Sequence, residues 1–119
     1  MSKTASPSSA TKLRVVLAPG TFIGPGKADI LQGILETGSI SAAGRRMGMS
    51  YKRAWQLVET LNGYFKGPLV TAATGGKAGG GASLTRLGAE VLKRYRAMEA
   101  ATAKACAADV KTLQKYRAK

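Results

Sequence analysis

Residues 38–62, GSISAAGRRMGMSYKRAWQLVETLN, constrain the fold of this chain more than any other part of its sequence. Gly48 separates two stretches of helical patterning, and Ser50 stands where a serine can cap the second stretch by accepting a backbone N–H. The segment is therefore predicted to form a helix, a tight turn and a second helix that ends near Phe65. The apolar side of this second helix should pack on two preceding helices.

Hydrophobic periodicity and turn residues divide the rest of the chain into short elements. Ile30, Leu31, Ile34 and Leu35 form the stripe of an amphipathic helix, which Gly38 ends. The predicted elements, in chain order, are a strand at 13–18, a break at 24–26, helices at 27–37, from Ser39 or Ser41 to about 47, and from 50 to about 65, strands at 69–73 and 82–85, and a helix from about 86 to 117.

A glycine-rich stretch, TGGKAGGGA at residues 74–82, joins the last two predicted strands. Five of the seven residues from Gly75 to Gly81 are glycine, and Lys77 carries the only charge. A hairpin tip with so few side chains exposes its backbone amides, which suits contact with a phosphate or with the minor groove of DNA. A helix-turn-helix followed by such a hairpin has the layout of a winged-helix protein.

The last predicted helix has about 30 residues, which makes it longer than a core of this size can cover. Its seam of mostly apolar residues, spaced four and three apart and interrupted by Asp109, consists of Leu87, Val91, Tyr95, Met98, Thr102, Ala105, Leu113 and Tyr116. We expect the surplus of this seam to pair with a second subunit. A frayed, alanine-rich tail is the alternative.

The predicted fold class is mainly α with a small β-hairpin. A chain of 119 residues has room for one domain. The expected organisation is a disordered N-terminal tail at 1–11, a winged helix-turn-helix domain at 12–85 and a long C-terminal dimerisation helix at 86–119.

The charge balance favours a polyanionic partner. Nineteen Lys and Arg residues stand against six Asp and Glu, which gives a net charge of +13. A domain this basic attracts nucleic acid through a long-range, salt-dependent interaction. A merely solubilising surface charge is the alternative. No apolar run is long enough for a membrane span or a signal peptide, so a cytoplasmic protein at the bacterial nucleoid is expected.

Catalysis and metal binding are not expected. Histidine is absent, which removes the usual general base and the usual metal ligand, and Cys106 is the only cysteine. The sequence therefore predicts a protein without enzymatic activity, cofactor, zinc site or internal disulfide.

The start of the second helix of the helix-turn-helix is predicted to enter the major groove of DNA. Lys52 and Arg53 can donate to guanine, and Gln56 can pair with adenine. Trp55 faces the same side, where it either meets DNA or belongs to the core. The residues predicted to bind DNA are Ser39, Ser41, Arg45, Arg46, Ser50, Tyr51, Lys52, Arg53, Trp55, Gln56 and Lys77.

Three segments carry a family resemblance: GSIS at 38–41, SYKRAW at 50–55 and ATGGKAGGGASLT at 73–85. They resemble the N-terminal winged-helix domain of the ModE family of molybdate-responsive transcription regulators. The helix-turn-helix alone also fits the broader LysR-type family. The resemblance covers residues 13–98, most of the chain. It implies a homodimer that binds a palindromic operator near molybdate-transport or molybdoenzyme genes.

The chain departs from the ModE pattern after its long helix. The resemblance implies C-terminal domains that hold molybdate at their dimer interface, whereas this sequence stops at Lys119. Direct molybdate binding by these residues is therefore not expected. The sequence is either a lone DNA-binding domain or a fragment of a longer protein.

The sequence favours a dimeric, sequence-specific DNA-binding regulator whose two half-sites lie about one helical turn, ~34 Å, or a multiple of it apart. Two alternatives remain open. One is a non-specific architectural DNA-binding protein, which the net charge fits equally well. The other is an oxyanion-binding protein that uses the glycine tip as an amide nest for molybdate.

Overall fold

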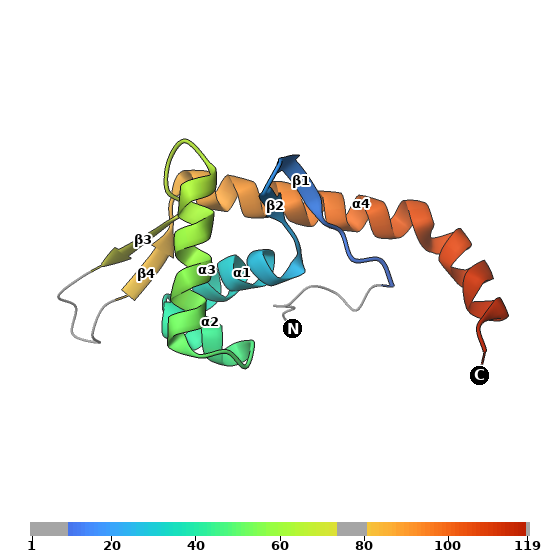
Figure 1. The fold of residues 1–119 in the computed structure, drawn as a ribbon, viewed down its shortest axis with the longest axis horizontal. Coiled ribbons are helices and arrows are strands. Elements are labelled where there is room, and N and C mark those ends of the chain that lie inside the picture. The colour runs from blue at the N-terminus through green and yellow to red at the C-terminus, as the bar shows by residue number, and fades with distance from the viewer. Residues whose placement is uncertain (1–9, 74–80, 119) are drawn as a thin grey trace.

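The computed structural model describes residues 10–73 and 81–118, and its fold is a winged helix-turn-helix followed by a long C-terminal helix (Figure 1). This is the predicted mainly helical class, with two small antiparallel hairpins. The elements are β1 (Val15–Ala18), β2 (Thr21–Ile23), α1 (Pro25–Thr37), α2 (Ile40–Arg46), α3 (Tyr51–Tyr64), β3 (Val70–Ala73), β4 (Gly81–Leu84) and α4 (Arg86–Tyr116).

The boundary of α1 differs from the sequence prediction. The expected break at 24–26 is wrong, because Pro25 is the first residue of α1 and Gly26 lies inside the helix. Proline is well suited to this first position, since it has no N–H to leave unsatisfied and its φ is already helical. Gly38 ends α1 as predicted, with a positive φ of 73° and its N–H bonded to the carbonyl of Ile34.

The helices approach one another closely because small residues face each other at their crossings. A Cβ added to Gly33 of α1 would lie 2.8 Å from the Cβ of Ala43 in α2. The same holds for Gly44 of α2 against Ala54 of α3. Neither contact has room for a methyl group, so these glycines set the separation at which α1, α2 and α3 pack.

One hydrophobic core joins the three helices, both hairpins and the first half of α4. Its largest fully buried side chains are Ile30, Leu31, Ile34, Leu61, Leu69 and Tyr95. α4 runs along the top of this core and continues well past it, which makes the molecule elongated at 55 × 29 × 24 Å (Figure 1).

The predicted seam of α4 is used in two different ways. Tyr95 is buried, and its hydroxyl donates to the carbonyl of Leu13 over 2.7 Å. In contrast, the exposed fraction of the surface is 66% for Leu113 and 78% for Tyr116. The first half of α4 thus packs inside its own chain, and the pairing of the surplus seam beyond it with a second subunit stays a prediction.

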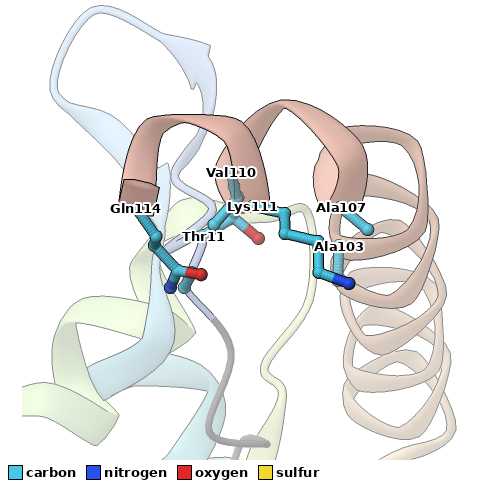
Figure 2. Close-up of a pocket in the computed structure, with 7 residues that line it drawn as sticks. Thr11, Ala103, Ala107, Val110, Lys111 and Gln114 are labelled. Atoms are coloured by element: carbon cyan, nitrogen blue, oxygen red, sulfur yellow. The ribbon is translucent and has the colours of Figure 1, made fainter. Parts of the chain in front are cut away.

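The start of the described chain lies against the far half of α4. Ala10 and Thr11 line a hollow of about 340 Å³ with Ala103, Ala107, Val110, Lys111 and Gln114 of α4 (Figure 2). These are the only described residues of the tail predicted at 1–11. None of the helices in residues 10–73 and 81–118 combines the length and hydropathy needed to traverse a lipid bilayer.

Candidate nucleic-acid interface

α3 presents a polar face opposite its buried face. Ser50 caps the helix as predicted, because its Oγ accepts the N–H of Arg53 over 3.1 Å. Ala54, Val58 and Leu61 are buried against the core. The side chains predicted to face DNA from the start of this helix are all exposed: Tyr51, Lys52, Arg53, Trp55 and Gln56.

Lys52 and Arg53 form no ion pair with any other residue that the structure describes. Their charges are therefore available to an external anion. Both residues lie in the first turn of the 14-residue helix α3, directly after its N-terminal cap. The turn between α2 and α3 leaves this end of the helix exposed.

Trp55 lies at the edge of a groove between α3 and the wing. The groove has a volume of about 400 Å³ and is lined by Ile40, Trp55, Val58, Glu59, Asn62, Gly63, Val70 and Ala72. Since 39% of Trp55 is exposed, the indole is not a core residue of this chain. The alternative of a buried tryptophan is thereby excluded.

α2 contributes two arginines with different local partners. Arg45 Nη1 donates to Ser41 Oγ over 3.0 Å, and Arg46 Nη1 donates to Glu36 Oε1 of α1 over 2.7 Å. Both arginines are exposed and lie in the last turn of α2. Ser39 is the cap of α2, because its Oγ accepts the N–H of Ala42 over 3.0 Å.

The turn between α2 and α3 depends on Gly48. Its φ of 70° is in the left-handed region, which favours glycine. The N–H groups of Met47 and Met49 both donate to the carbonyl of Gly44 over 3.0 Å, which closes the end of α2. This turn aims the first residues of α3 away from the core.

The wing is held to the helices by hydrogen bonds that the sequence analysis missed. Asn62 Oδ1 accepts the N–H groups of Leu69 and Val70 over 2.8 and 3.0 Å, while its Nδ2 donates to the carbonyl of Val70 over 3.1 Å. On the other strand, the Ala82 N–H donates to the carbonyl of Gly38 over 2.9 Å. The glycine tip with Lys77 lies outside the described residues.

A second basic cluster lies near the C-terminal end of α3. The Arg14 guanidinium and the Lys27 ammonium each lie 3.8 Å from the centroid of the Phe22 ring, and Lys27 also lies 5.5 Å from that of Tyr64. Such cation–π contacts anchor the β1–β2 hairpin on α1. No local pattern in the sequence indicates this cluster.

Asp29 of α1 and two acidic side chains of α4, Glu90 and Glu99, form ion pairs with arginines. Arg96 of α4 pairs with Asp29 of α1 and with Glu99, and Arg94 pairs with Glu90. Burial lowers the pKa of Arg96, but the hydrogen bonds that it donates to Asp29 and Glu99 more than offset this and raise its pKa above the ordinary value. In the described part of the chain, no three acidic or cysteine side chains gather closely enough to hold a metal ion.

Comparison with known proteins matches this region. Residues 27–89, from α1 to the start of α4, match the bacterial regulatory helix-turn-helix proteins of the lysR family. The molybdenum-pterin-binding protein MopB of Rhodobacter capsulatus is 47% identical over 94 residues, which are 79% of this chain and 35% of MopB.

Two transcription regulators are also similar to the chain. The transcriptional regulator ModE of Yersinia pestis is 41% identical over 83 residues, which are 70% of this chain and 32% of that protein. The DNA-binding transcriptional dual regulator ModE of Escherichia coli strain K12 is 40% identical over 83 residues, with the same shares of 70% and 32%. The chain thus spans about a third of the length of these relatives.

Proposed function

The chain belongs to the lysR family of bacterial regulatory helix-turn-helix proteins, and on this premise we propose that it is a sequence-specific DNA-binding transcription regulator of ModE-like type. The observation that carries the proposal is the exposed polar face at the capped start of α3, where Lys52 and Arg53 have no ion-pair partner among the described residues. The name of one relative, the molybdenum transport protein ModE of Azotobacter vinelandii, supports a link to molybdenum transport.

In the proposed complex, α3 enters the major groove with its N-terminal end first. Lys52 and Arg53 donate to guanine O6 and N7, and Gln56 pairs with adenine N6 and N7. Arg45 and Arg46 contact phosphates from α2. Trp55, which lines the groove beside the wing, lies against the sugar–phosphate wall, and Lys77 of the tip contacts the flanking backbone or the minor groove.

We propose that the protein acts as a homodimer through α4. An apolar groove of about 200 Å³, lined by residues that include Leu17, Ile23, Phe65, Val91 and Met98, runs between β1, β2, the end of α3 and α4. Leu17 is 53% and Met98 41% exposed, and farther along α4 the exposed Leu113 and Tyr116 extend the apolar surface. A second copy would cover these side chains, and its pairing would fix the spacing of two half-sites.

Selection of bound sites from a random DNA pool tests this function. We expect a palindromic preference with a specific affinity about 10³-fold or more above that for random DNA. Equal binding to all sequences would favour the architectural alternative instead.

Substitution of Lys52 separates base reading from general charge. Lys52→Ala should cost about 1–3 kcal/mol on the selected site and relax its base preference. Lys77→Ala should weaken binding to all sequences about equally. The control is Lys93→Ala, which removes one exposed lysine from α4, outside the proposed interface, and should leave the base preference unchanged.

A measurement of molybdate binding tests the alternative that the chain is an oxyanion-binding protein. The name of MopB says that this relative binds molybdenum-pterin, but the proposal assigns only DNA binding to residues 1–119. Calorimetry with molybdate and with tungstate should give no binding in the micromolar range. A clear isotherm would favour the oxyanion-binding alternative.

A further inference from the structure

One acidic side chain of α3 lies on the face that is proposed to meet DNA. Of the six Asp and Glu residues in the chain, four form ion pairs with arginines: Asp29, Glu36, Glu90 and Glu99. Glu59 and Asp109 form no ion pair with any residue that the structure describes. Asp109 is exposed on the far half of α4, whereas Glu59 is exposed on α3.

Glu59 carries the only charge among the described residues that line the groove between α3 and the wing. The positions three and four residues away on α3, where an ion-pair partner would stand, are Trp55, Gln56, Asn62 and Gly63. The amide of Asn62 is already bonded to the backbone of the wing. Across the groove, β3 contributes Val70 and Ala72, and α2 contributes Ile40, all of them apolar. The described walls of the groove therefore offer Glu59 no cation.

The position of Glu59 along α3 suits contact with a base. Glu59 follows Lys52 by seven residues, so the two side chains point within about 20° of each other around the helix axis. They are separated by ~10 Å along that axis. This separation equals about two or three base pairs of DNA. A helix that lies in the major groove would thus bring Glu59 to a base pair other than the one that Lys52 reads.

We propose that Glu59 is a specificity-determining residue that requires a base with an exocyclic amino group at one position of each half-site. This inference rests on the proposed function. A carboxylate can only accept hydrogen bonds. In the major groove, cytosine N4 and adenine N6 donate, whereas guanine O6 and thymine O4 accept. Glu59 therefore admits cytosine or adenine at this position and excludes guanine and thymine. On random DNA it also faces acceptors and phosphates, and so it weakens non-specific binding.

Selection from a random DNA pool with the native protein and with Glu59→Gln tests the proposal. An amide both donates and accepts, so the variant should admit guanine or thymine where the native protein excludes them. The preference for an amino base at that position should fall by about tenfold or more. The affinity for random DNA should rise about twofold, because a negative charge is removed. The substitution keeps the size of an exposed side chain, and an unchanged midpoint in urea checks that the fold is intact.

Asp109→Asn is the matched control. It also neutralises an exposed carboxylate without an ion pair among the described residues, but on the far half of α4. At physiological salt it should change neither the base preference nor the affinity for random DNA. An equal rise in affinity in both variants would overturn the proposal. So would a Glu59→Gln protein that binds every sequence more tightly with an unchanged preference, since Glu59 would then only repel phosphates.

A modified operator tests the contact itself. The amino base at the selected position is replaced by an analogue that lacks the amino group. The native protein should lose about tenfold or more in affinity for this operator. Glu59→Ala should lose much less, because it has no acceptor for the amino group to meet. Equal losses in the two proteins would overturn the contact.

The same experiments separate failure of this inference from failure of the proposed function. A native protein that selects no sequence contradicts the proposed function, and with it the role given to Glu59. A palindromic operator that Glu59→Gln selects unchanged contradicts only the role of Glu59.

Discussion

α4 packs so closely on the wing that the residue at the contact must be a glycine. A Cβ added to Gly88 of α4 would lie well inside van der Waals contact with the carbonyl oxygen of Leu69 and 2.9 Å from its carbon. That carbonyl already accepts the N–H of Thr85 over 2.9 Å, so it cannot move aside without losing a hydrogen bond. Gly88 is therefore required for close approach and not for a special φ.

Gly88→Ala should destabilise the fold by about 1–3 kcal/mol, because the added methyl group collides with backbone and not with a flexible side chain. Gly63→Ala is the control, since nothing lies within 4 Å of a Cβ at that helical position. It should be neutral or stabilise by about 0.5–1 kcal/mol through helix propensity. Urea denaturation measures both, and equal effects of the two substitutions would contradict the close approach.

Tyr95 should make the stability fall at alkaline pH. Burial, followed by the charge of Glu99, raises the pKa of Tyr95 above its ordinary value of 10.0. The folded state therefore holds the phenolic proton more tightly than the unfolded state does. The resulting stability is complete below pH 10 and is lost as the pH rises through the raised value. The free energy of unfolding should decline more steeply above pH 10 in the native protein than in Tyr95→Phe.

The same substitution has a second effect at neutral pH. Tyr95→Phe removes the hydrogen bond to the Leu13 carbonyl, at a cost of about 1 kcal/mol. Identical alkaline slopes for both proteins would show that Tyr95 does not titrate differently on folding.

At the scale of elements, the amide of Asn62 joins the wing to α3. This side chain of α3 satisfies the backbone of Leu69 and Val70, where the chain enters β3. The strand had been predicted to begin at Leu69 but begins at Val70. The N–H of Leu69 bonds to the Asn62 amide, and its carbonyl bonds to the N–H of Thr85 outside the β3–β4 ladder.

Asn62→Leu should leave these backbone groups without their partner and cost about 1–3 kcal/mol. Amide hydrogen exchange at Leu69 and Val70 should accelerate, while exchange in α1 stays slow. Gln114→Leu, on the exposed last turns of α4, is the control and should change neither quantity. Unchanged exchange at Leu69 in Asn62→Leu would mean that β4 alone holds the wing.

The sequence predicted those elements whose signals are local. The Ser50 cap, the Gly38 end of α1 and the period of α3 depend on neighbours a few residues apart, and the structure confirms them. The pairing of Arg96 with Gln32 joins residues 64 positions apart, and no local pattern indicates it. The helical periodicity of α3 identified its exposed face. The role of Asn62, in contrast, depends on where the chain passes α3 again as it enters β3.

The start of α1 was mispredicted for a physical reason, and the spacing of the α4 seam left its packing partner undecided. Gly-Pro-Gly was interpreted as a break because each residue disfavours a helix interior, yet proline is favoured in the first turn. Heptad-like spacing on α4 does not distinguish packing on the chain's own core from packing on a partner. Tyr95 belongs to the first kind, and Leu113 has the exposure expected of the second.

At the scale of the whole molecule, an elongated and strongly basic body has an apolar groove at the junction of α4 and the β1–β2 hairpin. Leu17→Glu should convert the proposed dimer into a monomer, because a second copy would bury the new charge in this groove. Val16→Glu is a close control. Val16 is 63% exposed on the same strand, but it does not line the groove.

Sedimentation equilibrium should therefore give a dimer for the native protein and for Val16→Glu, and a monomer for Leu17→Glu. The salt dependence of DNA binding should become shallower in the monomer, since half of the phosphate contacts are lost. A native protein that sediments as a monomer at micromolar concentration would contradict the dimer.

Thr11 and Gln114 lie near the two ends of the described chain and line the same hollow (Figure 2). A short peptide could join them, and the backbone could be reopened at the exposed residues Lys66 and Pro68, before the wing. Such a circular permutant would keep every contact of the core while separating the order of synthesis from the order of packing. The refolding rate of this permutant would then show whether α4 has to follow the other elements in the chain for the core to form.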